Sequence, residues 1–181
     1  MIATLVYTYL LICVLMVAEV SSNQLHSFVK LKNIQCRTSH PDLVSLEECR
    51  ILDKSNESKV QTLCYFKERP INQINLRMKS YIKRPVGYVP FVIYINVDWC
   101  DFLVKRNNVI LKRLFNLVEK YSNMHTTCPI DQDYIYLNAS LGKNRGFYLP
   151  FRFPLGEYRL DFLTTFNLDI KVATYVYFEV E

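Results

Sequence analysis

Glycine and histidine are scarce in this chain, and their scarcity limits the chemistry that it can carry out. The 181 residues contain four glycines and three histidines. The glycines form neither a phosphate-binding loop nor the Gly-x-Ser-x-Gly turn that presents a catalytic serine. His26, His40 and His125 lie far apart in the sequence and match no metal-binding spacing. We therefore expect no catalytic residue, no metal and no cofactor, so the protein is not expected to be an enzyme.

Long apolar runs are equally rare, and the single one opens the chain. Residues 5–17 are almost entirely apolar and are followed by Ser21 and Ser22, a pattern typical of a signal peptide and its cleavage site. The run is about 13 residues long, whereas a membrane-spanning helix needs about 20. We predict a signal peptide over 1–22, a single secreted extracellular domain over 23–181, and no stable membrane anchor. An uncleaved anchor is the alternative, because no basic residue precedes the run.

Basic residues are present in modest excess but do not gather in one stretch. There are 22 Lys and Arg against 17 Asp and Glu, which gives a formal net charge of +5. Basic residues spread in this way are typical of a solvated surface. We therefore expect no nucleic-acid partner.

Five cysteines lie outside the signal peptide, and none of them forms the Cys-x-x-Cys pair of a zinc site. In an oxidising compartment such cysteines are disulfide candidates. We propose the pairs Cys36–Cys49 and Cys100–Cys128, although the sequence leaves three connectivities open for these four residues. Cys64 lies at an alternating position among apolar residues, so we expect it to stay free as a small buried hydrophobic side chain.

Two Asn-x-Ser triplets fit a protein that passes through the secretory route. Asn56-Glu57-Ser58 and Asn138-Ala139-Ser140 match the acceptor pattern for N-glycosylation. We predict glycosylation at Asn56 and Asn138.

Alternation of apolar and polar residues with period two predicts that most of the domain consists of β-strands. The alternation is clearest over 74–83 and is repeated over 170–180. Further strands are predicted near 28–36, 48–52, 60–67, 88–97, 134–141 and 158–165. About eight strands with few helices favour a mainly β fold, a two-sheet antiparallel sandwich of the immunoglobulin-like kind.

One segment has helical spacing instead. Over 109–121 the apolar residues recur every three or four positions, which predicts one amphipathic helix. Asn108 is placed to cap its start, and Ser122 and Asn123 mark its end. A disulfide between Cys100 and Cys128 would fix the helix to the sandwich. Packing of the apolar stripe on the core is the favoured interpretation, and a helix that binds a partner is the alternative.

Three polar or special residues have local structural explanations. Pro90 lacks a backbone N–H and is expected at a strand edge or start. Asp98 is placed to accept backbone hydrogen bonds at the turn into the helical region, which we favour over a catalytic role. His125 is interpreted as a packed loop residue, with a pH-sensitive hydrogen bond as the alternative.

Five short motifs occur in a characteristic order. They are Asn-Ile-Gln-Cys at 33–36, Gly-Tyr-Val-Pro-Phe at 87–91, Asp-Trp-Cys-Asp-Phe-Leu at 98–103, Ser-Asn-Met-His-Thr-Thr-Cys-Pro at 122–129 and Pro-Leu-Gly-Glu-Tyr at 154–158. Together they resemble a large insect family of small secreted proteins that carries a domain of unknown function and includes relatives of the CheB chemosensory proteins. Cys36, Cys49, Cys100 and Cys128 match recurrent cysteines of that family, whereas Cys64 departs from its pattern.

This family is distantly similar to the ML lipid-recognition superfamily, whose two sheets part to admit a lipid tail. The resemblance implies an ML-like sandwich that binds a lipid-like or pheromone-like apolar ligand in chemosensation. The apolar stretch 146–154 lies in an expected loop and is the candidate mouth of such a ligand site. The candidate mouth residues are Arg145, Phe147, Tyr148, Phe151, Arg152 and Phe153. A loop folded over the end of the core is the alternative.

A second function remains open. The chain is also interpreted as a secreted protein–protein recognition module with a filled core and no small-molecule ligand, whose partner is a receptor or another extracellular protein. Tyr81, Tyr175 and Tyr177 are expected to point outward and would suit such a surface. The two functions differ in one feature, an apolar cavity between the sheets.

Overall fold

The computed structural model describes residues 27–54, 57–124, 127–141, 146–149, 152–167 and 169–181. The strands in this part of the chain are β1 (Ser27–Thr38), β2 (Val44–Lys54), β3 (Glu57–Phe66), β4 (Ile74–Arg84), β5 (Gly87–Asp98), β6 (Tyr134–Ser140), β7 (Gly146–Leu149), β8 (Gly156–Phe166) and β9 (Ile170–Val180). The helices are α2 (Trp99–Lys105), α3 (Val109–Val118) and the short 3-10 helix η1 (Glu119–Tyr121).

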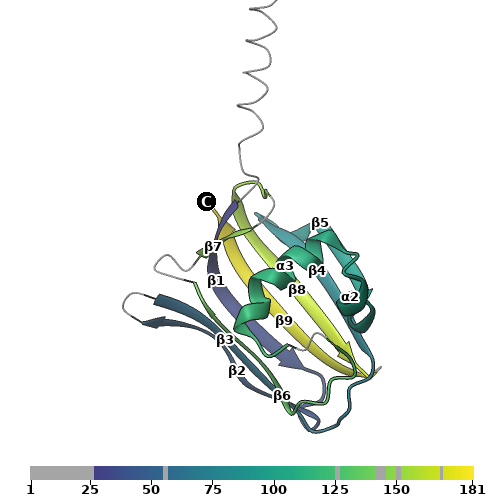
Figure 1. Cartoon of the computed structure of the whole chain (residues 1–181). Helices are drawn as coiled ribbons and strands as arrows, with labels where there is room; N and C mark the ends of the chain where they lie inside the picture. Colours follow the sequence, from purple (N-terminus) through teal and green to yellow (C-terminus); the bar gives the residue numbers. More distant parts are fainter. Residues whose placement is uncertain (1–26, 55–56, 125–126, 142–145, 150–151, 168) are drawn as a thin grey trace, which may run out of the picture.

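The strands form two sheets that share one hydrophobic core (Figure 1). The large sheet has the strand order β5-β4-β8-β9-β1-β7, and the small sheet has the order β2-β3-β6. Every pairing within them is antiparallel. The mainly β, two-sheet antiparallel sandwich predicted from the sequence is therefore confirmed.

Two short elements depart from the predictions. The spacing predicts a loop over 146–154, but Gly146–Leu149 form β7, which pairs with β1 at the edge of the large sheet. The spacing also predicts one helix over 109–121, whereas α3 and η1 share that segment and α2 precedes them. Four residues are too few for alternation to reveal a strand, and α2 makes only about two turns. Neither element leaves a periodic pattern in the sequence.

The predicted alternation on β4 is confirmed, and it defines the two faces of the large sheet. Ile74, Met78 and Ile82 are buried on one face, while Asn75 and Lys83 between and beyond them are exposed on the other. Residues that pair directly across antiparallel strands point to the same face. The register therefore extends both faces from β4 to the neighbouring strands.

The inner face of the large sheet is covered by two different structures (Figure 1). Helix α2 packs on β4 and β5. Helix α3 packs on α2 through Phe115, whose ring centroid lies 5.4 Å from that of Trp99 and 6.2 Å from that of Phe102. The small sheet faces the rest, and β2 lies against β1. The helical segment is therefore core packing, as the favoured interpretation predicts.

Two disulfides hold these layers in place, and they are the two pairs proposed from the sequence. Cys36 of β1 is bonded to Cys49 of β2, which joins the two sheets. Cys100 of α2 is bonded to Cys128, which joins the helical segment to the chain just before β6. Cys64 is free and only partly buried.

The capping residues behave as the sequence predicts. The Asp98 carboxylate accepts a hydrogen bond from the Asp101 backbone N–H at 2.9 Å and caps α2. The Asn108 side chain accepts one from the Leu111 N–H at 2.9 Å and caps α3. Pro90 lies on β5, an edge strand, where its missing N–H leaves no partner unsatisfied. Local backbone geometry therefore accounts for these motif residues.

Two further motifs are also explained by local contacts. The buried Tyr158 donates its hydroxyl hydrogen bond to the Pro154 carbonyl at 2.8 Å, across a turn at Gly156 with φ of +143°. Only glycine adopts that φ without strain. The Asn123 amide pairs with β6 as a strand would, donating to the Tyr134 carbonyl and accepting from the Tyr136 N–H, each at 2.8 Å. His125, from the same motif, lies outside the described residues.

Candidate functional site: an apolar middle zone between the sheets

Aromatic side chains close one end of the sandwich. Tyr158 and Phe178 are fully buried, and their rings stack with centroids 5.5 Å apart. Phe153 packs edge-on against Tyr158 at 5.0 Å, and Phe91 of β5 lies 5.4 Å from Tyr158. These rings leave little of their own surface for a ligand.

The opposite end is closed as well. Phe66 of the small sheet and Phe166 of the large sheet meet with ring centroids 5.0 Å apart. Ile71 and Ile130 form an isolated β-bridge and are both almost completely buried. Val44 is buried beside them on the inner face of β2. The two ends of the sandwich are therefore sealed by apolar side chains.

Between these ends, apolar side chains that point inward are only partly buried. The register places Phe162 opposite the buried Met78, and Val176 opposite the buried Ile34, so these side chains face the small sheet. We call this region the apolar middle zone. It consists of Phe162, Thr164, Val172, Thr174 and Val176 of the large sheet and Leu46, Cys64, Ile135 and Leu137 of the small sheet, and is bordered by Leu114 and Leu117 of α3.

Several side chains of the middle zone are partly exposed although they belong to central strands. Strands β8 and β9 are the third and fourth of the six strands in the large sheet, and β3 is the central strand of the small sheet. Edge exposure therefore does not explain why Phe162, Val176 and Cys64 contact solvent. In the same sheet Met78 is 0% exposed and Val29 1%. The opposite sheet and the helices therefore cover these inner side chains less completely than they cover Met78 and Val29.

The middle zone is apolar in chemistry. None of its members carries a charge, and its polar groups are the hydroxyls of Thr164 and Thr174 and the thiol of Cys64. The Thr174 hydroxyl donates to the sulfur of Cys36 at 3.9 Å. Burial raises the pKa of the Cys64 thiol to about 12, because the thiolate is poorly solvated there. This zone suits an uncharged group and disfavours an ionised one.

The predicted mouth residues take different positions. Arg145 and Phe151 lie outside the described residues. Phe147 pairs with the buried Val29, so it points inward, and it is partly buried. Phe153 is buried in the aromatic end, and its backbone N–H donates to the Ser27 hydroxyl at 2.8 Å.

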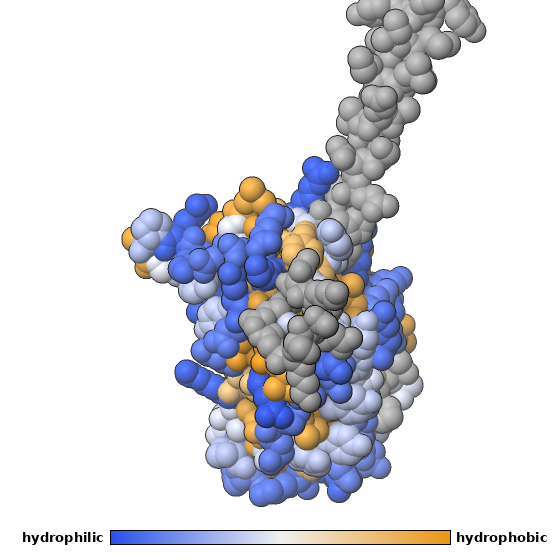
Figure 2. Space-filling model, turned by 90° about the vertical axis from the view of Figure 1, so that its left-hand side faces the viewer, coloured by the Kyte–Doolittle hydropathy of each residue, from blue (hydrophilic) through white to orange (hydrophobic). Residues whose placement is uncertain are grey.

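Tyr148 and Arg152 remain at the surface. Tyr148 is 63% exposed and packs edge-on against Phe28 with ring centroids 5.4 Å apart. Arg152 is exposed. The structure thus brings Phe147 and Phe153 to the core and leaves Tyr148 and Arg152 accessible. Hydrophobic residues are also visible among hydrophilic ones on the face that Figure 2 shows.

Of the two predicted glycosylation sites, one lies in the part of the chain that the structure describes. Asn138 lies on β6, the edge strand of the small sheet, and is exposed on its outer face. An exposed asparagine has room for a glycan, so glycosylation at Asn138 stays a prediction with accessible geometry. Asn56 lies outside the described residues.

Sequence reasoning did not identify the middle zone. Alternation assigns Val172 and Val176 to the inner face, but it does not tell how closely the opposite sheet approaches them. No group of three or more potential metal ligands occurs among the residues that the structure describes. None of the helices in the described ranges has the length and hydrophobicity needed to cross a bilayer.

Comparison with known proteins gives three findings. No curated protein matches the chain. The chain is similar to the crystal structure of a Niemann-Pick type C2 protein from Japanese carpenter ant, with 14% sequence identity and a TM-score of 0.33, over 84% of this chain and 92% of that chain. Residues 74–160, which span β4 to the first half of β8 and hold four of the five sequence motifs, match the model of the family described as protein of unknown function (DUF1091).

Proposed function

We propose that this protein is a secreted carrier that binds an apolar ligand between its two sheets. The observation that supports this most directly is the partial exposure of inward-facing side chains on central strands, Phe162 and Val176 among them. Inner side chains of central strands are normally covered by the opposite layer, and interiors are close-packed with few voids. Accessible apolar surface between two sealed ends is what a small hydrophobic ligand needs.

The chemistry of the middle zone narrows the ligand class. Its walls are aliphatic and aromatic, so most of the ligand should be hydrocarbon. No charged side chain belongs to the zone, and an ionised ligand group would be left unpaired there. The hydroxyls of Thr164 and Thr174 are suited to one neutral polar group, such as a hydroxyl or a carbonyl. A lipid-like or pheromone-like molecule fits this description.

Secretion forms part of the proposal and rests on independent observations. Two disulfides join separate parts of the fold, and disulfides persist in oxidising compartments. The predicted signal peptide over 1–22 points to the same compartment, although it lies outside the described residues. A carrier in an extracellular fluid would meet its ligand there.

Native mass spectrometry of the full chain, secreted from cultured cells and purified at neutral pH, tests the proposal when followed by lipid extraction. A co-purifying lipid or long-chain hydrocarbon that is released on unfolding would support the carrier and identify its ligand class. An apo mass, with no uptake of a fluorescent fatty-acid probe or a fluorescent sterol probe, would overturn it. The alternative, a recognition module with a filled core, would then be favoured.

A matched pair of substitutions tests the middle zone itself. Val172 belongs to the zone, whereas Val29 is buried on β1. Val29→Phe should lower the free energy of unfolding by about 1–3 kcal/mol, because a packed core does not accept a larger side chain without strain. Val172→Phe should lower it by less than about 1 kcal/mol and block uptake of the fluorescent probes, because the ring occupies free space. Equal destabilisation by the two variants would mean that the interior is filled.

A further inference from the structure

The outer face of the large sheet carries a cluster of tyrosines around one arginine. The guanidinium of Arg159 lies 4.5 Å from the ring centroid of Tyr81, 5.2 Å from that of Tyr88 and 5.7 Å from that of Tyr175. Two hydrogen bonds of 2.6 and 2.9 Å join Arg159 to the carboxylate of Asp161. Held from several sides, this side chain is fixed in place. The outward direction predicted for Tyr81 and Tyr175 agrees with these contacts.

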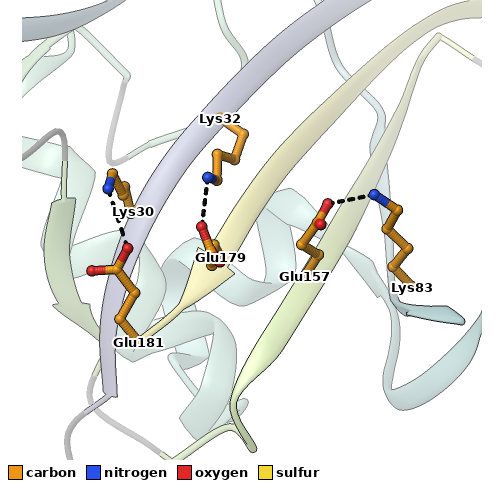
Figure 3. Close-up of polar contacts among 6 residues, drawn as sticks. All are labelled: Lys30, Lys32, Lys83, Glu157, Glu179 and Glu181. Carbon is orange, nitrogen blue, oxygen red and sulfur yellow. Dashed lines mark hydrogen bonds and ion pairs between the residues drawn. The ribbon is translucent and has the colours of Figure 1, made fainter.

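Cations and carboxylates are paired at one end of this face, where the tyrosine cluster begins. Figure 3 shows three such pairs across neighbouring strands. They are Lys30–Glu181 at 3.2 Å, Lys32–Glu179 at 2.5 Å and Lys83–Glu157 at 2.8 Å. The hydrogen bond from Lys32 holds the pKa of Glu179 below its usual value, and the hydrogen bonds to Glu179 and Glu157 raise the pKa values of Lys32 and Lys83. Charge at this end is therefore largely neutralised.

The other end of the same face has cations without carboxylate partners. Arg77, Leu163, Ala173 and Arg37 lie in one row across β4, β8, β9 and β1. Among the residues that the structure describes, neither Arg37 nor Arg77 makes an ion pair. Both arginines are exposed. Two accessible positive charges thus flank an apolar pair of side chains.

A hollow lies beside this row. Its volume is about 160 Å³, which is the size of one side chain rather than of a lipid. It is lined by Arg77, Lys79, Asp161, Phe162, Leu163, Ala173 and Tyr175. It lies on the outer face, and Phe162 is the one residue that it has in common with the middle zone as defined above. The nitrogen of Lys79 lies 5.3 Å from the ring centroid of Tyr94, an exposed tyrosine on β5.

We propose that this outer face binds an acidic segment of a partner protein. One apolar side chain of the segment enters the hollow above Leu163 and Ala173, and its carboxylates contact Arg37 and Arg77. Arginine and tyrosine are enriched among the residues that dominate protein–protein binding energy. This interaction goes beyond the proposed carrier function, because it does not depend on a ligand between the sheets.

The charge pattern favours a protein over a membrane or a polyanion. Carboxylates of Glu157, Asp161, Glu179 and Glu181 lie on the same face as the arginines. A uniformly anionic surface would meet these carboxylates as well as the cations and would be repelled by them. A protein segment places its charges at chosen positions, so it can contact Arg37 and Arg77 while its carboxylates stay away from the paired end and from Asp161, which lines the hollow and is paired with Arg159. Complementary charge of this kind gives specificity.

Fluorescence polarisation with a synthetic peptide tests the proposal on the full secreted chain. The probe is a fluorescein-labelled peptide, Glu-Asp-Glu-Leu-Glu-Asp-Glu, and its control has Gln and Asn in place of Glu and Asp. The acidic peptide should bind at low salt and weaken as salt is raised, because exposed charges are screened. The neutral peptide should bind at least about tenfold more weakly.

Two changes to the face and one matched control locate the binding. The double variant Arg37→Glu with Arg77→Glu should weaken binding of the acidic peptide at least about tenfold, and Ala173→Trp, which fills the hollow, should do the same. Lys67→Glu with Lys112→Glu changes net charge equally at exposed positions outside this face and should leave binding within about twofold. Circular dichroism and thermal denaturation check that each variant folds. Arg37→Gln with Arg77→Gln replaces the reversal if it does not fold.

Three outcomes would overturn the proposal. The first is no binding of the acidic peptide by the wild-type chain at low salt. The second is an equal loss of binding in the control double variant, which would mean that net charge alone is responsible. The third is Arg37- and Arg77-dependent binding of heparin or of phosphatidylserine vesicles with no binding of the peptide, which would assign the face to a polyanion or to a membrane.

Discussion

The inner and outer faces of the large sheet differ in chemistry although the same strands build both. On β9 the inward residues Val172, Thr174 and Val176 belong to the apolar middle zone, while Ala173 and Tyr175 between them line the outer hollow. Parity along a strand decides which face a residue joins. What lies over that face decides whether the residue is buried. Along β9, the two candidate surfaces therefore use alternate residues of the same strand.

The two surfaces also differ in what stabilises them. On the inner face, apolar burial at the sealed ends holds the sheets together, and the middle zone can stay accessible because those ends are closed. On the outer face, Arg159 and its tyrosine partners order one another through ring and charge contacts, with little burial by other elements. Changes to the inner face should therefore affect stability most, and changes to the outer face should affect binding most.

The largest difference between the faces is expected in the loss of unfolding free energy when two adjacent residues of β4 are replaced. Met78 is 0% exposed on the inner face, and Arg77 is exposed on the outer face. Met78→Ala should lower the free energy of unfolding by about 2–5 kcal/mol, because it leaves a cavity in packed surroundings. Arg77→Ala should change it by no more than about 0.5 kcal/mol. Chemical denaturation of both variants measures this contrast, and similar losses in the two would contradict the assignment of faces.

Alternation was sufficient to predict most of the strands, but it did not predict which parts of each sheet are covered by other elements. The pattern over 74–83 places Met78 inside and Arg77 outside because each strand position has only two directions to choose from. Asp98 and Asn108 are recognisable as caps because their side chains bond to backbone groups a few residues away. Strand β7 is not predictable in this way, since it is defined by its pairing with β1 and not by its own pattern.

The candidate sites depend on contacts between distant segments, so the sequence did not reveal them. Arg159 meets Tyr81 and Tyr175 only because β8 lies between β4 and β9 in the sheet. Phe162 and Phe166 have the same parity on β8, yet Phe166 is sealed by Phe66 while Phe162 remains partly exposed. The strand predicted over 158–165 includes Phe162 but ends before Phe166, and it does not indicate how well either ring is covered. Their difference depends on contacts with the opposite sheet, which no local pattern records.

A smaller difference between the middle zone and the outer face should appear in how the free energy of unfolding changes at high pH. Burial raises the pKa of Cys64 to about 12, above the value of about 8.5 for an unfolded thiol. The folded state therefore holds this proton more tightly, and the stability that results is present below the unfolded pKa and is lost as pH rises toward 12. The stability difference between the wild type and Cys64→Ala should shrink by about 1–2 kcal/mol from pH 7 to pH 10.

Denaturant titrations of both proteins at each pH, without reductant, measure this change. Comparison with the variant cancels the titration of lysines and tyrosines elsewhere in the chain. A difference that stays constant up to pH 10 would mean that the Cys64 thiol is well solvated, which would contradict its place between the sheets. The outer-face variant Ala173→Ser, which alters no titratable group, should show a constant difference from the wild type.

The smallest effect should come from the ion pairs at the neutral end of the outer face. The hydrogen bond from Lys32 lowers the pKa of Glu179, so this carboxylate contributes stability above its unfolded pKa and loses that contribution as pH falls through the folded value. Both side chains are substantially exposed, and exposed pairs contribute little. The stability difference between the wild type and Glu179→Gln should therefore be small at pH 7, exceed that of Glu68→Gln at an exposed position, and decrease as pH falls through the folded pKa or as salt is raised to about 1 M. A difference as large as that of Met78→Ala would instead mean that the Lys32–Glu179 pair is desolvated in the folded protein, which would contradict its exposure at this end of the outer face.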